Sequence, residues 1–102
     1  MEEVNVLGIK DGALTIALSG DIDLGNAEAF YREVVKAYNA SPADISFDCE
    51  KLDFIDSTTL GTFVKILKML KTDDRKMKLF HLPSKIKKLF LICSLDSIME
   101  IA

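Results

Sequence analysis

The chain is poor in the residues that enzymes and metal centres use most often. It has one histidine, His81, and two cysteines, Cys49 and Cys93, among 102 residues. Two cysteines make neither a disulfide framework nor a set of zinc ligands. A single imidazole leaves a serine nucleophile only one candidate base. These shortages argue against catalysis, a metal or a cofactor, and since both cysteines lie in apolar patterns we expect buried free thiols.

Phosphate-binding glycine loops and long apolar runs are also missing. Gly20 and Gly25 fit neither the P-loop nor the dinucleotide-binding spacing. No apolar run approaches the ~20 residues that span a bilayer. The acidic start, Met1-Glu2-Glu3, lacks the positive charge of a secretory signal. We therefore expect no membrane insertion and a cytoplasmic location.

Charge is distributed unevenly along the chain. Residues 1–56 carry twelve acidic and four basic residues, whereas residues 57–102 carry nine basic and four acidic ones. The overall net charge of -3 argues against nucleic acid as a partner. We expect the bases of the second half to lie on solvated helix faces; the alternative is that part of them dock an acidic surface.

The hydrophobic pattern predicts one α/β domain over residues 1–102. Apolar residues make up 49% of the chain, enough for a real core. Strand-like alternation and helix-like spacing follow one another in the order β-β-α-β-α-β-α. The predicted strands are 4–9, 13–18, 45–49 and 77–82; the predicted helices run from about 26 to 39, from 58 to 71 and onward from 84; and 98–101 is a last short strand or helix turn.

This order predicts a mixed, mostly parallel sheet of four to five strands with three to four helices. The turn Asp11-Gly12 favours a tight hairpin between the first two strands. Strands that alternate with helices favour right-handed crossovers and parallel pairing. The sequence leaves open whether the helices cover one face of the sheet or both.

The stretch 52–61, Leu-Asp-Phe-Ile-Asp-Ser-Thr-Thr-Leu-Gly, joins the third predicted strand to the second predicted helix. We expect Phe54 and Ile55 to be buried. Ser57 or Thr58 is the expected N-cap of the helix, beside free backbone N–H groups that favour an anion. Taken alone, this pattern is typical of an ordinary helix cap.

Three carboxylates precede the predicted helix starts. Asp21 and Asp23 lie in the segment 19–26, which we predict to be a loop, and Asp56 precedes Ser57. Solvated loop acids and caps are the favoured interpretation. The alternative is a carboxylate cluster that binds a divalent cation.

Three segments together resemble the STAS domain family and, within it, the bacterial anti-sigma factor antagonists. The resemblance covers nearly the whole chain in the right order, and its specific part is Phe-Ile-Asp-Ser followed by Leu-Gly. The segments are Leu18-Ser19-Gly20-Asp21-Ile22-Asp23, Leu52-Asp53-Phe54-Ile55-Asp56-Ser57 with Leu60-Gly61, and Lys87-Lys88-Leu89-Phe90.

The resemblance implies a STAS-like fold and a phosphorylation-controlled protein-binding switch that regulates transcription, without enzyme activity or cofactor. In such proteins the serine after the aspartate is phosphorylated by an anti-sigma factor that is also a serine kinase. The unphosphorylated form binds that partner and releases the sigma factor, and a serine phosphatase resets the switch. By position Ser57 is the implied phospho-acceptor, with Thr58 as the alternative. The implied partner-binding acidic rim is Asp21, Asp23, Asp56, Thr58 and Thr59.

The chain departs from the family pattern after the acceptor serine. The family often has Ser-Gly there, and this chain has Thr58-Thr59. Glycine allows a partner's backbone to approach closely, so Thr59 is expected to narrow partner choice or to slow the kinase. Two alternative functions stay open: a STAS scaffold or ligand-binding module of a transport or stress-signalling complex with unmodified Ser57, and a small enzyme that uses Ser57 and the acids.

Overall fold

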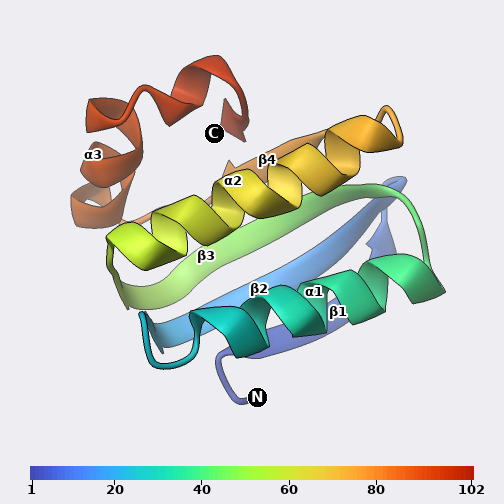
Figure 1. Cartoon of the computed structure of the whole chain (residues 1–102), viewed down its shortest axis with the longest axis horizontal. Coiled ribbons are helices and arrows are strands. Elements are labelled where there is room, and N and C mark those ends of the chain that lie inside the picture. Colours follow the sequence, from blue (N-terminus) through green and yellow to red (C-terminus); the bar gives the residue numbers. More distant parts are fainter.

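The computed structural model describes residues 1–102, and its five strands form one sheet in the order β1-β2-β3-β4-β5 (Figure 1). The predicted α/β class, mixed sheet and element order are confirmed. The C-terminal segment forms both a helical turn and a short strand. The elements are β1 (Val4–Lys10), β2 (Ala13–Ile22), α1 (Ala27–Ala40), β3 (Asp44–Ile55), α2 (Ser57–Thr72), β4 (Met77–Phe80), α3 (Ser84–Ile92), the 3-10 helix η1 (Leu95–Ser97) and β5 (Glu100–Ile101).

The predicted hairpin between β1 and β2 is confirmed. The two strands pair antiparallel, and the turn residues Asp11 and Gly12 have φ values of 51° and 82°. Two successive positive φ values are the mark of the type I′ turn, whose twist matches that of the flanking strands. Asparagine, aspartate and glycine are the residues that tolerate such values best.

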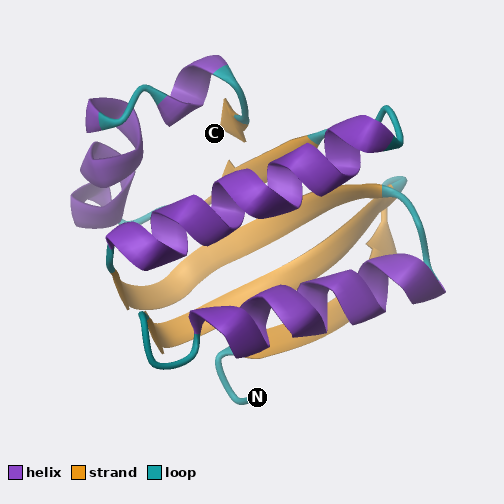
Figure 2. Ribbon diagram, in the orientation of Figure 1, coloured by secondary structure: helices purple, strands orange, loops and turns teal.

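The strands β2 to β5 pair in parallel, and each successive strand adds to the same side of the sheet. Right-handed crossovers that all step in one direction place their helices on one face. Accordingly α1 and α2 lie across the same face of the strands (Figure 2). The opposite face carries no helix of this chain, which answers the question that the sequence left open.

The core lies between that sheet face and the helices. Phe63 of α2 is its centre, with ring centroids 5.3 Å from Phe30, 5.4 Å from Phe47 and 5.4 Å from Phe90, all edge to face. All four rings are fully buried. Such pairs contribute about 0.5–1.5 kcal/mol each beyond their buried area. The cluster therefore ties α1, α2 and α3 to β3.

The longest helix, α2, has 16 residues, and no helix combines the length and apolar character needed to cross a membrane. Cys49 in β3 is buried, as predicted, but Cys93 is exposed, so its predicted burial is wrong. Cys93 is the C-cap of α3, where the chain has already left the helical repeat that suggested an inward position.

The strands β2 and β3 run further than predicted, to Ile22 and to Ile55 respectively. The polar residues that suggested a loop, Ser19 and Asp21, alternate with Gly20 and the buried Ile22. The predicted start of the loop at Ser19 is therefore wrong. These polar side chains belong to the strand because its other face is not covered by helices.

The predicted burial of Phe54 is also wrong, whereas that of Ile55 is confirmed. Gly20 pairs with Leu52 and the next residue, Asp21, pairs with Phe54, so β3 contains one extra residue there. This bulge breaks the alternation. Leu52 and Ile55 point into the core, and Phe54 is left 49% exposed.

Candidate functional site

The carboxyl ends of β2 and β3 lie side by side, with Ile22 opposite Ile55 in the register. Each strand leads within a few residues into a helix, α1 or α2 (Figure 1). Parallel strands bring their carboxyl ends to the same edge, which is where open α/β sheets place their ligand sites. This topology brings the segment after Asp21 next to the segment that contains Asp56 and Ser57.

Asp56 is the N-cap of α2, so the prediction that Ser57 or Thr58 caps the helix is wrong. Its Oδ1 accepts the backbone N–H of Thr59 at 3.0 Å, and its Oδ2 accepts the backbone N–H of Leu24 at 2.9 Å. The carboxylate thus joins the start of α2 to the β2–α1 loop. The bond from Thr59 is the main reason that the pKa of Asp56 lies below its usual range, and the Leu24 amide adds to it against the opposing effect of burial.

Thr59 is fully buried, so its predicted place on the partner-binding rim is wrong. Its hydroxyl bonds to the backbone carbonyl of Ile22 and also lies 3.0 Å from Oδ1 of Asp56. A hydroxyl has one hydrogen, and both neighbours are acceptors, so the proton is shared between them. Thr59 therefore fixes the end of β2 against α2 from the inside.

A second set of bonds shapes the β2–α1 loop. Oδ1 of Asp23 accepts the backbone N–H of Gly25 at 2.9 Å. Asn26 is the N-cap of α1, but its side chain makes no capping bond; it accepts the N–H of Asp23 and donates to the carbonyl of Asp21. The loop is thus closed on itself and presents Leu24, which is 76% exposed.

The side chains of Ser57 and Thr58 are exposed in the first turn of α2. Neither hydroxyl makes a hydrogen bond within the chain, so both are accessible to a modifying enzyme. The exposed Asp21 and the partly exposed Asp23 and Asp56 come from the same sheet edge. A group bound to Ser57 would meet the positive end of the helix dipole together with this set of negative charges.

The structure brings most of the predicted rim together but not a cation site. The ligand atoms of Asp21, Asp23 and Asp56 do not converge closely enough to share an ion. Two of these carboxylates already accept backbone N–H groups. Two exposed apolar residues, Leu24 and Phe54, were not predicted for this edge: Phe54 was expected to be buried, and no motif marks the exposure of Leu24.

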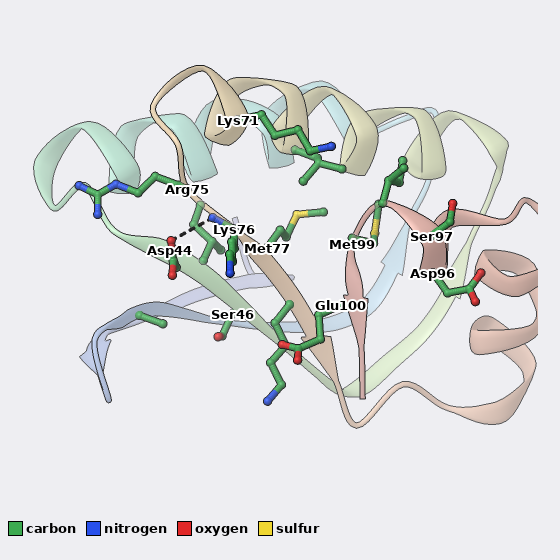
Figure 3. Close-up of a pocket in the computed structure, with 15 residues that line it drawn as sticks. Asp44, Ser46, Lys71, Arg75, Lys76, Met77, Asp96, Ser97, Met99 and Glu100 are labelled. Carbon is green, nitrogen blue, oxygen red and sulfur yellow. Dashed lines mark hydrogen bonds between the residues drawn. The ribbon is translucent and has the colours of Figure 1, made fainter.

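A hollow of about 550 Å³ lies at the opposite end of the sheet (Figure 3). It is lined by the start of β3 and β4, the end of α2, and the segment from η1 to β5. The amide of Lys76 donates to Asp44 at its edge. Its charged side chains are of both signs, so the lining favours no particular ligand. The charged lining residues are Lys71, Arg75, Lys76, Lys78, Asp44, Asp96 and Glu100.

Comparison with known sequences gives one consistent answer. The model of the STAS domain family matches residues 6–102. An anti-sigma-B factor antagonist of Bacillus subtilis is 30% identical over 93 residues, which are 91% of this chain and 84% of that protein. An anti-sigma-B factor antagonist of Staphylococcus aureus is 25% identical over 92 residues, 90% of this chain and 85% of that protein.

Solved structures share the fold at lower identity. An anti-sigma factor antagonist from Mycobacterium paratuberculosis superposes with a TM-score of 0.82 at 18% identity, over 96% of this chain and 84% of that one. The unphosphorylated anti-sigma factor antagonist SpoIIAA gives a TM-score of 0.75 at 17% identity, over 97% and 86% of the two chains. The phosphorylated SpoIIAA of Bacillus gives 0.74 at 20% identity, over 97% and 90%.

Proposed function

The chain belongs to the STAS domain family, and we propose that it is an anti-sigma factor antagonist controlled by phosphorylation of Ser57. In its unphosphorylated form it binds an anti-sigma factor with serine kinase activity and thereby releases a sigma factor. The kinase transfers phosphate to Ser57, which ends the interaction, and a serine phosphatase restores it. The protein is thus a binding switch of the cytoplasm and not an enzyme.

One observation carries this proposal: Ser57, the residue directly after the N-cap Asp56, has an exposed hydroxyl. Asp56 fixes the backbone before Ser57, and Thr59 fixes it from the inside, so the acceptor is held on rigid structure and not on a mobile loop. A kinase needs such an accessible and positioned hydroxyl. The 30% identity to an anti-sigma-B factor antagonist supports the same conclusion.

The charges around Ser57 explain how a phosphate would act. It adds about −1.5 to −2 charges. The amide of Thr59 is already taken by Asp56, so the helix start has fewer N–H groups to offer the phosphate. The phosphate must then remain on the surface beside Asp21, Asp23 and Asp56, where it makes a negative rim more negative.

The partner is expected to contact both the rim and the apolar side chains beside it. Leu24 and Phe54 are 76% and 49% exposed, and Leu24 lies on the loop that Asp56 holds. Aromatic and aliphatic anchors surrounded by polar groups are typical of the centre of a protein interface. Added phosphate would raise the cost of desolvating this surface without changing the fold. In support, SpoIIAA matches this fold equally well with and without phosphate.

Phosphate mapping tests the proposal. Wild type and Ser57→Asp are used as paired baits in lysate of the source cell to obtain the ATP-binding partner that only wild type retains. That partner is then incubated with ATP and with wild type, Ser57→Ala or Thr58→Val. We expect one phosphate on wild type and on Thr58→Val, and none on Ser57→Ala.

Three results would contradict this proposal. Phosphate that persists on Ser57→Ala would move the acceptor to Thr58 or elsewhere. Retention of the same proteins by both baits, or of transport components alone, would favour the scaffold module with unmodified Ser57.

A further inference from the structure

Two acids and the only histidine meet on the face of the sheet that no helix covers. Asp48 and Glu50 belong to β3, on either side of the inward-pointing Cys49. Asp48 pairs with Phe80, the last residue of β4, and His81 follows directly. This cluster is separate from the Ser57 site and is not used in the proposed switch.

The ligand atoms of the three side chains converge. Nδ1 of His81 lies 3.2 Å from Oδ1 of Asp48. One carboxylate oxygen of Glu50, one of Asp48 and a ring nitrogen of His81 all lie within 4.8 Å of one another. Zinc bonds of about 2.0–2.2 Å to nitrogen and oxygen place two tetrahedral ligand atoms roughly 3.3–3.5 Å apart. Nδ1 of His81 and Oδ1 of Asp48 already have nearly that separation, and the exposed Glu50, with an oxygen within 4.8 Å of both, is the third candidate ligand.

We propose that Asp48, Glu50 and His81 bind a divalent first-row transition metal ion, with Zn²⁺ as the first choice. An imidazole with two carboxylates suits zinc, nickel or cobalt, whereas magnesium and calcium prefer oxygen ligands alone. The two carboxylates lie close enough to repel each other, and one divalent ion neutralises both charges. Three protein ligands leave a fourth tetrahedral position for water or for a side chain from a partner.

Two of the three ligands are held in place before any ion binds. The backbone N–H of Glu50 donates to Oδ1 of Asp48 at 3.2 Å, which orients that carboxylate. The backbone of His81 has a φ of 59°, a value that most residues avoid and that histidine tolerates better than most. The ring of Phe80 contacts the imidazole edge to face at 4.8 Å. A bound ion would therefore connect the middle of β3 to the end of the short strand β4.

An exposed His–Asp ion pair is the competing explanation, and such a pair contributes only about 0–1 kcal/mol. It does not account for Glu50, whose negative charge gains nothing from a second carboxylate at its side. Asp48 and Glu50 line a second hollow together with the charged groups of Glu2, Lys51 and the N-terminus of Met1, and this N-terminus pairs with Glu33. The ion pair and the metal site are distinguished by the role of Glu50.

Zinc titration of the full chain without a histidine tag tests the proposal. A Cys93→Ser background removes the one exposed thiol, which would otherwise bind zinc itself. Calorimetry is expected to give one Zn²⁺ per chain, and the single imidazole is expected to shift its 15N resonances on binding. Glu50→Gln and His81→Asn should each weaken binding by about tenfold or more, as loss of even an outer-sphere partner costs about 10–100-fold.

The matched control is Asp53→Asn, which removes an exposed acid of the same strand outside the cluster. It should change the affinity by less than about twofold, as expected for one distant surface charge. Zn²⁺ should also raise the midpoint of thermal unfolding, and the rise should increase with the logarithm of the free Zn²⁺ concentration above the dissociation constant. At the same Zn²⁺ concentration the rise should be smaller in Glu50→Gln. The proposal is overturned by an absence of zinc binding at millimolar Zn²⁺, by unchanged affinity in Glu50→Gln, or by equal weakening in Asp53→Asn.

Discussion

Replacement of Thr59 by valine tests whether the buried hydroxyl holds the site together. Valine keeps the branched shape of threonine, so the cavity stays filled, but the carbonyl of Ile22 and Oδ1 of Asp56 lose the one hydroxyl proton that they share. Thr59 is fully buried, so water does not replace the lost bond. A buried acceptor without its partner costs about 1–3 kcal/mol. In a domain of this size that lowers the unfolding midpoint by roughly 4–8 °C per kcal/mol.

Urea unfolding followed by circular dichroism measures the effect, with Thr58→Val as the matched control. Thr58 lies one residue earlier in the same helical turn and is exposed, so the identical substitution should change the stability by about 0.5 kcal/mol or less. The slope of the free energy of unfolding against urea concentration should be the same for all three proteins. If Thr59→Val is as stable as Thr58→Val, the hydroxyl is not needed, and our account of how the site is held would be refuted.

Three further predictions concern the site and the core. Hydrogen bonds lower the pKa of Asp56 in the folded state, so its contribution to stability is present above the unfolded pKa of about 3.9 and is lost as the pH falls through the lower folded value. The difference in free energy of unfolding between wild type and Asp56→Asn, measured in urea, should therefore shrink as the pH falls from 6 to 3. A difference that stays constant over this range would contradict the prediction. Burial raises the pKa of Cys49 to about 12, so a thiol reagent should label only Cys93 in the native chain and both thiols in guanidinium, whereas two fast native thiols would disagree with the structure. Phe63→Ala should cost about 3–5 kcal/mol in urea unfolding, against about 0.5 kcal/mol for the exposed Phe54→Ala, and equal costs would show that the aromatic cluster is not the core.

The order of elements could be predicted because each element carries a local signal. The turn Asp11-Gly12 and the breaks at Pro42 and Pro83 separate segments whose apolar residues repeat at strand or helix spacing. Whether the helices cover one face of the sheet or both could not be predicted, because this depends on the spatial order of the strands and not on a local pattern. The ends of β2 and β3 were also predicted too early. In β2, polar residues such as Ser19 can belong to the strand only because one face of the sheet is open. In β3, the bulge after Leu52 breaks the alternation of apolar residues.

The location of Ser57 at the start of a helix could be predicted from the surrounding sequence. The structural roles of the residues around it could not. Asp56 and Thr59 bond to the backbone of Leu24 and Ile22, which lie 32 and 37 residues earlier in the chain, so a local sequence pattern could not show these bonds. Asp56 was assigned to the rim and proved to be the cap, and Thr59 was assigned to the surface and proved to be buried. Leu24 and Phe54 were not identified, because their exposure depends on the loop and the bulge that hold them.

The most direct test of the switch compares the unmodified chain with a chain that carries phosphoserine at position 57. The binding of each to the anti-sigma factor retained by wild type is measured by calorimetry, and circular dichroism checks that the fold is unchanged. We predict that the phosphate weakens binding by at least about tenfold, since like charges placed together in an interface cost several kcal/mol. Equal affinity of the two chains, with the fold intact, would contradict the claim that phosphorylation of Ser57 controls the partner.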